Sequence, residues 1–266
     1  MAANDTLPTI HVGMTDKAMY VDGPTSIPAG RLRLTLENAK TKHEGVLGVV
    51  KLNTGFTWKD FRAGIKVVGQ NLFAPNGNKK KGLKALNHVI DNITAYGGMD
   101  TAPGQTERST LLLTQPGTYA LFNDSGQVPR DPRRLTVGAA SGAQTLVADA
   151  HVVAHTNRRF GGDTVLPAHG TISFTNESTE SPHFLNIQHV KNGTTRKQVI
   201  SSFSGSGSPN IFLEGTQGTD LVSYQQTMSL KLHLPKGTYA LACFFPDPKT
   251  GMPHAFMGMV RIVHLK

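Results

Sequence analysis

An internal repeat is the sequence feature that most constrains the fold. The run Gly-Thr-Tyr-Ala-Leu occurs at residues 117–121 and again at 237–241, each time after a strand-like apolar segment. A second pair, Ile-Pro-Ala-Gly at 27–30 and Leu-Pro-Ala-His at 166–169, keeps the same order along the chain. The copies lie 120 to 139 residues apart, which predicts two homologous domains, 1–138 and 146–266. Small residues near 136–145 are expected to link them.

Apolar and polar residues alternate within each half. Leu32, Leu34 and Leu36 alternate with polar residues, and positions 228–234 repeat this pattern. A period of two is typical of half-buried strands, and Pro-Gly, Lys-Gly and Asn-Gly turns separate the runs. The predicted fold is therefore all-β, with two Greek-key β-sandwich or barrel domains.

One insertion in the first half departs from this pattern. Residues 76–81 are expected to form a basic loop, and apolar residues at 83, 86, 90 and 93 follow at helical spacing. We expect one amphipathic helix here, packed on the first domain. A helix lying on a membrane surface is the weaker interpretation, because no tryptophan anchors it.

The composition narrows the class of protein. Only 38% of residues are apolar, with 28 Gly and 15 Pro, and no apolar run is long enough to span a bilayer. The formal charge of +9 is diffuse, which indicates a solvated surface, with an anionic partner or the cell envelope as the alternative. No basic stripe carries interleaved aromatic residues, so nucleic acid is not expected as a partner.

Four side chains in the second half form a candidate metal-ligand set. Cys243 is the only cysteine, and His254 and Met259 follow it after a turn-rich loop. His183 lies sixty residues upstream, on the same predicted strand face as Leu185. One thiolate, two imidazoles and a weak thioether are the ligands of a blue-copper site. The plainer interpretation of a lone cysteine is a small buried apolar side chain.

The second half resembles a cupredoxin, the fold of plastocyanin and azurin, from about residue 149 onward. The resemblance rests on a Pro-His after a strand ending in Asn, on Gly-Thr-Tyr before the cysteine, and on the final His-Ala-Phe-Met-Gly-Met. It implies one copper ion, held by the imidazoles of His183 and His254, the thiolate of Cys243 and the axial thioether of Met259.

The loop between Cys243 and His254 departs from the family pattern. It has ten residues, where plastocyanin and azurin have two to four. Closure entropy grows slowly with loop length, by about 0.6 kcal/mol per doubling, so a loop rich in proline and glycine can still fold back as a hairpin. The sequence leaves open whether the site is a normal blue site or an altered one.

Other histidines lack this context. In the first half Asn123 aligns with Cys243, and His43 falls only near the position of His183, so this domain is expected to be a degenerate copy without metal ligands. His151 and His155 lie four residues apart on one predicted strand and are expected at the surface.

The resemblance implies an electron-transfer protein rather than an enzyme. The alternative is a copper carrier or sequestering protein with the same ligands, or a metal-free binding module in which Cys243 is merely buried. An oxidoreductase of the nitrite reductase or laccase type is the weaker interpretation. No two histidines are closer than four residues, and Phe244 follows Cys243 where those enzymes need a histidine.

The resemblance also implies a place of action. Because it is to exported copper proteins, we expect a periplasmic or secreted protein whose export signal has been removed. The partner is expected to be a redox protein or a copper-exchange protein. The sequence does not specify this partner, the reduction potential or the oligomeric state.

Overall fold

The structure is a computed structural model that describes residues 7–15, 18–40, 42–125, 132–140 and 145–266. The first half contains the strands β1 (Thr9–Thr15), β2 (Met19–Asp22), β3 (Ser26–Lys40), β4 (Gly45–Leu52), β5 (Ile93–Thr101), β6 (Thr106–Leu113), β7 (Gly117–Asn123) and β8 (Arg133–Ala140). The second half contains β9 (Ala150–His155), β10 (Arg159–Gly162), β11 (Val165–Leu166), β12 (His169–Asn176), β13 (Asn186–Val190), β14 (Phe212–Gly218), β15 (Thr227–His233), β16 (Gly237–Ala242) and β17 (Val260–Leu265).

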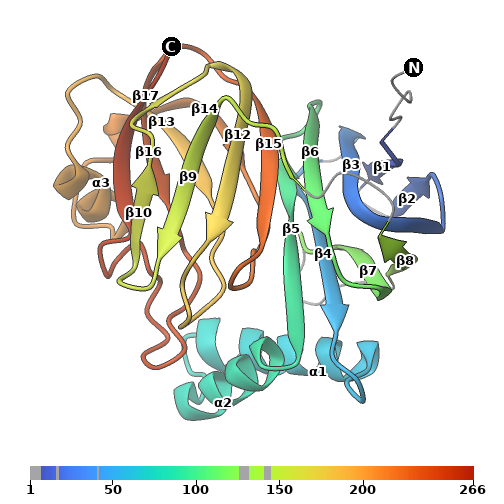
Figure 1. The fold of residues 1–266 in the computed structure, drawn as a ribbon. Coiled ribbons are helices and arrows are strands. Elements are labelled where there is room, and N and C mark those ends of the chain that lie inside the picture. Colours follow the sequence, from blue (N-terminus) through green and yellow to red (C-terminus); the bar gives the residue numbers. More distant parts are fainter. Residues whose placement is uncertain (1–6, 16–17, 41, 126–131, 141–144) are drawn as a thin grey trace, which may run out of the picture.

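These strands form one long sheet that spans both halves and one shorter sheet in the second half (Figure 1). The long sheet has the order β10-β9-β12-β15-β6-β3-β8-β7-β4-β5, and β1 and β2 extend from β3. The short sheet has the order β11-β17-β16-β13-β14. In the second half, β9, β12 and β15 pack against this short sheet as a sandwich.

The first half repeats this arrangement with one long strand in place of two short ones. The first part of β3 pairs with β8, and its later part pairs with β6. The register shifts between Ile27 and Ala29, close to Gly30 with its φ of 146°, so the strand can pass from one layer to the other. In the second half two separate strands occupy these positions, because β11 pairs with β17 in the short sheet and β12 pairs with β9 and β15 in the long sheet. The repeat therefore predicted a real structural duplication.

Two tyrosines at the repeated motif show how closely the halves match. The hydroxyl of Tyr119 donates to the carbonyl of Gln115 at 2.7 Å, and that of Tyr239 donates to the carbonyl of Pro235 at 2.8 Å. Both tyrosines are fully buried. Each ring fills its core while the hydroxyl finds a backbone partner four residues upstream, which explains why the motif occurs twice.

The halves meet where β15 pairs with β6. Ser229 lies opposite Thr110, and Leu230 lies opposite Ser109. Ser109 and Thr110 match Ser229 and Leu230 when the first half is shifted by 120 residues, the spacing of the Gly-Thr-Tyr motif. Exchanging the matched residues turns each of these two pairs into the other. An approximate twofold axis therefore passes through this strand pair. The strand β8 extends to Ala140, so the expected linker begins later than 136, and residues 141–144 lie outside the described part. The limits of the two domains stay a prediction.

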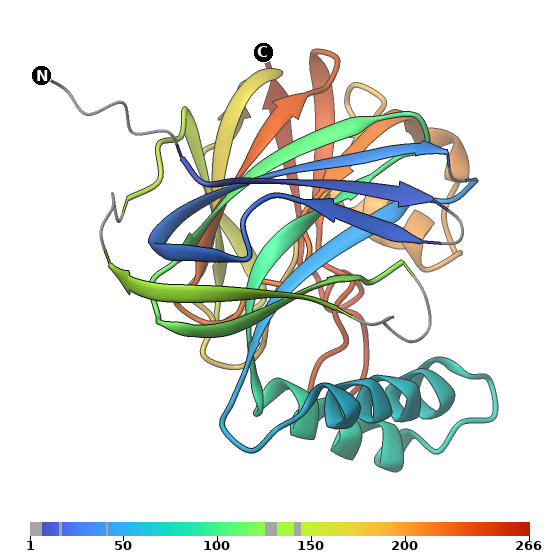
Figure 2. The same cartoon turned by 90° about the vertical axis from the view of Figure 1, so that its right-hand side faces the viewer.

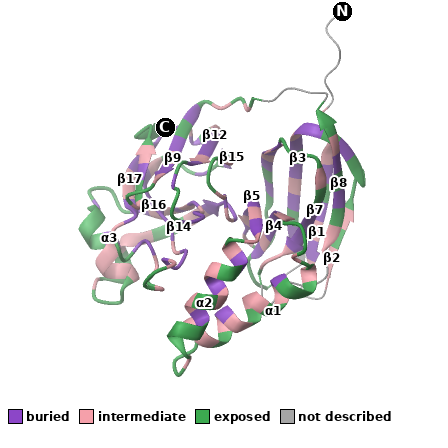
Figure 3. Ribbon diagram, turned by 60° about the horizontal axis from the view of Figure 1, so that its bottom comes forward, coloured by how far each residue is buried: buried purple, intermediate pink, exposed green. Residues whose placement is uncertain are grey.

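The alternation predicted from the sequence is confirmed in the core. Leu32, Leu34 and Leu36 are fully buried, and so are Leu230 and Leu232. Figure 3 shows buried and more exposed residues alternating along β3. Burial of a leucine side chain contributes about 1.5–3 kcal/mol, so this pattern fixes the register of each strand.

The helical insertion is larger than predicted. It contains α1 (Trp58–Val68), a π-helical turn η1 (Gly69–Phe73) and α2 (Lys79–Ile90), and the second half adds α3 (Arg196–Phe203) and the short 3-10 turn η2 (Pro209–Ile211). The expected basic loop in fact includes the first turn of α2, because the Asn78 side chain caps it by accepting from the Lys81 N–H. Ile93 belongs to β5 rather than to the helix.

The missed helix α1 had a readable signal. Thr57 and Asp60 form a reciprocal capping box at its first turn. Phe61 and Val68 are buried on the inner face, at helical spacing. The segment therefore carried the two marks of a helix, a start signal and a period near 3.6.

The helices α1 and α2 lie together at one end of the molecule, beside the loop that follows β16 (Figure 2). The Asn87 side chain on α2 donates to the carbonyl of Pro248 in that loop at 3.0 Å. The first half thus covers a loop of the second. No helix in the described residues has the length and apolar character required for a membrane crossing.

Candidate metal centre

His183 lies just before β13 and is held through its backbone. Its N–H donates to the carbonyl of Val222 at 3.1 Å, and its carbonyl accepts from the Val222 N–H at 2.8 Å. The side chain is fully buried, as are those of Leu185 and Ile187, which confirms that they share the inward face. The imidazole therefore points into the second half from a fixed position.

Cys243 follows the last residue of β16, and the ten-residue loop after it returns as a hairpin. The Ala255 N–H donates to the carbonyl of Cys243 at 2.7 Å, and the His254 N–H donates to that of Phe245 at 3.0 Å. Pro246 and Pro253 form an antiparallel bridge further along the loop. The chain can therefore span ten residues and still return His254 to the side of Cys243.

Three of the four predicted ligands converge. The Cys243 Sγ lies 3.6 Å from the Nδ1 of His183 and 3.8 Å from the Nδ1 of His254. All three donor atoms lie within 4.8 Å of one another, and all three residues are fully buried. The Nε2 atoms of both rings are buried without a hydrogen-bond partner among the described residues. Both imidazoles thus turn Nδ1 toward the thiol.

The fourth predicted ligand, Met259, is fully buried behind the loop. Its N–H donates to the carbonyl of His254 at 2.8 Å, and its carbonyl lies 3.4 Å from the Cys243 N. These contacts place its backbone beside two of the converging residues. Coordination by its thioether stays a prediction.

Burial controls the protonation of the cluster without metal. It lowers the pKa of His183 to about 3 and that of His254 to about 4, because a charged imidazole loses its solvation. Burial also raises the pKa of the Cys243 thiol to about 12. Near neutral pH both rings are neutral and ready to donate a lone pair, whereas the thiol must lose its proton to a metal before it can bind.

The sequence did not reveal how the loop is anchored. Asp247 in the loop is almost fully buried and accepts from the Arg158 guanidinium, at 2.8 Å from its Nη2 and 3.0 Å from its Nε. The Asp247 carboxylate also accepts from the Thr250 N–H at 2.7 Å. These contacts lower the pKa of Asp247 despite its burial. An ion pair between a buried aspartate in one loop and a partly buried arginine in a distant turn has no local sequence signal.

The helical insertion closes the same loop from the outside. A Cβ at Gly251, whose φ is 69°, would lie 2.7 Å from a Leu72 methyl and 3.3 Å from a Leu83 methyl. The loop therefore packs directly on η1 and α2. This contact explains why the cluster is buried although its loop is long.

The first half has no equivalent donors at the matching positions. Val50 pairs with Ala120 in the first half, and Gln188 pairs with Ala240 at the equivalent place in the second half. Five residues before Gln188 is His183, and five residues before Val50 is Gly45, so Gly45 occupies the position that matches His183. The same register places Asn123 at the position of Cys243. His43 is exposed, two residues from the matching position.

His151 and His155 lie on the outward face of β9. The Nδ1 of His151 is 2.7 Å from the Ser173 hydroxyl, and that of His155 is 3.2 Å from a Glu177 carboxylate oxygen. Within the described ranges, His183, Cys243 and His254 are the one group of three or more potential ligands that converges.

The donor set fits a copper ion. A thiolate and two imidazoles provide soft and intermediate ligands, which suit copper and exclude the hard cations calcium and magnesium. All three donors are fully buried and the backbone of Met259 lies beside two of them, which fits a closed copper site of the blue-copper type.

Comparison with known proteins gives weak likenesses only. No family model and no curated protein matches the chain. Among solved structures, reduced auracyanin from Roseiflexus castenholzii is 18% identical and covers 44% of this chain and 94% of its own, with a TM-score of 0.29. Copper nitrite reductase from Nitrosomonas europaea is 13% identical and covers 97% of this chain and 93% of its own, with a TM-score of 0.26. At these scores the likenesses carry none of the argument.

Proposed function

We propose that this chain, a two-domain cupredoxin-like protein, holds one copper ion in its second half and uses it to transfer single electrons. The observation that carries the proposal is the convergence of the Cys243 thiol and the two Nδ1 atoms in a fully buried position. When bound there, copper supplies a one-electron couple tuned by its ligands and their surroundings. Met259 is the proposed axial ligand.

The way in which the donors are held favours electron transfer. His183 is fixed by two backbone hydrogen bonds to Val222, and the hairpin fixes His254 to Phe245. Donors that cannot move keep their places in both oxidation states, so little has to reorganise when one electron is gained or lost. A closed, well-supported site also opposes exchange of the metal with a partner.

A short covalent route leads from the cluster to the surface. Phe256 and Met257 follow His254 by two and three residues and are 37% and 36% exposed. We propose this apolar part of the loop as the contact for a redox partner. The partner and an extracytoplasmic place of action belong to the same proposal.

A copper carrier is the second candidate, and one observation favours it. Met252 and Met257 lie on the same loop and are 48% and 36% exposed, and cuprous copper prefers soft ligands such as thioethers. Chelator competition separates the two roles. Loss of cuprous copper to a chelator should slow in Met252→Leu and Met257→Leu if these residues pass the metal on, and should stay unchanged if the protein is an electron carrier.

Copper loading followed by visible and EPR spectroscopy tests the main proposal. We expect an intense visible absorption that disappears in Cys243→Ser and in His254→Ala. Met259→Leu should keep the absorption but shift the reduction potential, whereas the matched change Met252→Leu at an exposed methionine should leave both unaltered. The absence of such a band, or its persistence in Cys243→Ser, would contradict the proposal.

An oxidoreductase remains the weaker alternative. Phe244 follows Cys243, so the second copper of a nitrite reductase would lack the adjacent histidine that links the two metals. Metal analysis that gives two copper ions per chain, together with turnover of nitrite, would favour the enzyme.

A further inference from the structure

A second site-like feature lies beside the donor cluster but does not include its three donors, at the place where the helical insertion faces the second half. It is a cavity of about 750 Å³. Apolar side chains form most of its wall, contributed by both halves: Val68, Leu86, Phe184, Leu221, Phe245 and Pro246. A volume of this size is typical of small-molecule sites, which are mostly apolar with a few convergent polar groups.

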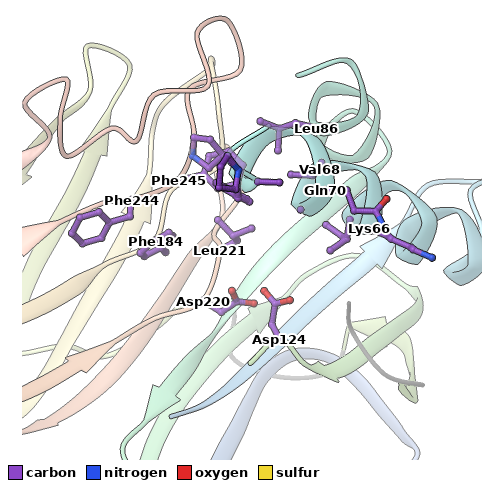
Figure 4. Close-up of a pocket in the computed structure, with 16 residues that line it drawn as sticks. Lys66, Val68, Gln70, Leu86, Asp124, Phe184, Asp220, Leu221, Phe244 and Phe245 are labelled. Carbon is purple, nitrogen blue, oxygen red and sulfur yellow. The ribbon is translucent and has the colours of Figure 1, made fainter. Parts of the chain in front are cut away.

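The convergent polar groups here are two carboxyls. Asp124 follows β7 of the first half, and Asp220 follows β14 of the second. Figure 4 shows their carboxyl groups facing one another at one end of the cavity. Asp220 is only 8% exposed. Among the described residues no side chain donates a hydrogen bond to either carboxyl or forms an ion pair with it, and Lys66 points away from both in Figure 4.

The backbone is shaped to hold the Asp220 carboxyl in this position. A Cβ at Gly48 would lie 2.3 Å from the Asp220 Oδ2, and a Cβ at Gly98 would lie 3.3 Å from the Asp220 Cβ. Both positions are glycines on the paired strands β4 and β5. The two glycines thus leave room for the buried Asp220 carboxyl, which has no side-chain partner among the described residues.

This arrangement is unfavourable without a ligand. Burial raises the pKa of Asp220 to about 7, and burial together with the neighbouring Asp220 raises that of Asp124. Two like charges in an apolar site oppose each other, whereas an opposite charge within contact would favour the ionised forms. Buried carboxyls are normally paired, and a backbone hydrogen bond from Leu221 only partly offsets the burial of the Asp220 carboxyl.

We propose that this cavity binds a small organic amine, with its apolar body against the aromatic and aliphatic wall and its ammonium group against Asp124 and Asp220. The chemistry of the wall separates this ligand from a metal ion. Calcium needs six to eight oxygen ligands and magnesium six, but beyond the two carboxyls the wall consists mostly of carbon. An amine uses both parts of the cavity.

The cavity also adjoins the donor cluster. Phe184 follows His183, and Phe245 lies two residues after Cys243, so a bound amine would contact side chains next to two ligands. Binding does not require the metal, so the proposal is independent of the copper proposal. It is therefore tested first on the metal-free chain.

Calorimetric titration with 2-phenylethylamine and with its neutral analogue 2-phenylethanol provides the test. The amine should bind about tenfold more tightly than the alcohol, because only the amine can pair with a carboxylate. Asp220→Asn and Asp124→Asn should each remove most of this preference and leave binding of the alcohol unchanged. Asp22→Asn, at an exposed residue on β2, is the matched control and should bind both probes as the wild type does.

The two asparagine variants keep the shape of the side chain, and either one suffices if the other fails to fold. Equal binding of the amine and the alcohol, or no binding of either, would overturn the proposal. A preference for the amine that persists in both variants would also overturn it. Repeating the titration on the copper-loaded chain shows whether a bound amine shifts the visible spectrum.

Discussion

Replacing Glu107 by glutamine should change how stability depends on pH. Glu107 lies on β6 at the strand pair that joins the halves, and it is 3% exposed. The Gln217 amide donates to its Oε2, and the Nε2 of His233 lies 3.3 Å from its Oε1. Burial is the largest influence and raises the pKa of Glu107 from 4.5 to about 8, although the Gln217 hydrogen bond opposes the rise.

The sign follows from proton binding. Between pH 4.5 and about 8 the folded protein keeps a proton on Glu107 that the unfolded chain has lost. The contribution of Glu107 to the free energy of unfolding is therefore largest below pH 4.5 and falls as the pH rises through this range. Each unit of pKa difference corresponds to about 1.4 kcal/mol, so the loss is on the order of 3–5 kcal/mol by pH 9.

Urea unfolding followed by circular dichroism from pH 4.5 to pH 9 measures this effect. Glu107→Gln is neutral at every pH, so it should match the wild type within about 1 kcal/mol at pH 4.5 and exceed it by a few kcal/mol at pH 9. Buried carboxyls that do not interact with Glu107 affect both proteins alike, so the difference between the two curves reports Glu107 together with its repulsion from Asp100.

Glu214→Gln is the matched control, because Glu214 is exposed on β14. It should follow the wild-type curve throughout. Parallel curves for Glu107→Gln and the wild type from pH 5 to pH 9 would refute the assignment of a protonated Glu107 in the folded protein.

Three further predictions concern packing and reactivity. In the metal-free folded protein, Cys243 should resist alkylation by iodoacetamide at pH 8, because its thiol is buried and has a pKa of about 12. It should react once the chain is unfolded. Rapid labelling of the folded chain, detected by mass spectrometry, would contradict this. Leu230→Ala should cost about 2–5 kcal/mol of unfolding free energy, against less than about 1 kcal/mol for Leu213→Ala at a more exposed position. Thr57→Ala should cost about 1 kcal/mol, because it removes the capping box of α1; an unchanged thermal midpoint would show that this cap contributes nothing.

Much of the fold could be predicted because its signals are local. The alternation around Leu34 reports which face of a strand is buried, and the paired Gly-Thr-Tyr motifs report that the same unit occurs twice. The helix α1 was missed although Thr57 and Asp60 marked its start. That error came from treating the insertion as one element, not from a missing signal.

Part of the candidate site could also be predicted from the sequence, and part required the structure. The residue types predicted a thiol and two imidazoles as donors, and strand parity predicted that His183 points inward. The structure alone shows that the hairpin returns His254 to within 3.8 Å of the Cys243 sulfur. It also shows the support given to that loop by Arg158 and by α2, which are remote in sequence.

By itself, the sequence determined the periodicity, the duplication and the kinds of atom available for chemistry, because each depends on residues near one another in the chain. Only the tertiary structure decided how the halves join through β6 and β15, and that Asp124 faces Asp220 across a cavity. Such contacts link segments about a hundred residues apart. Their energies come from burial and charge at one point in space, which no local pattern records.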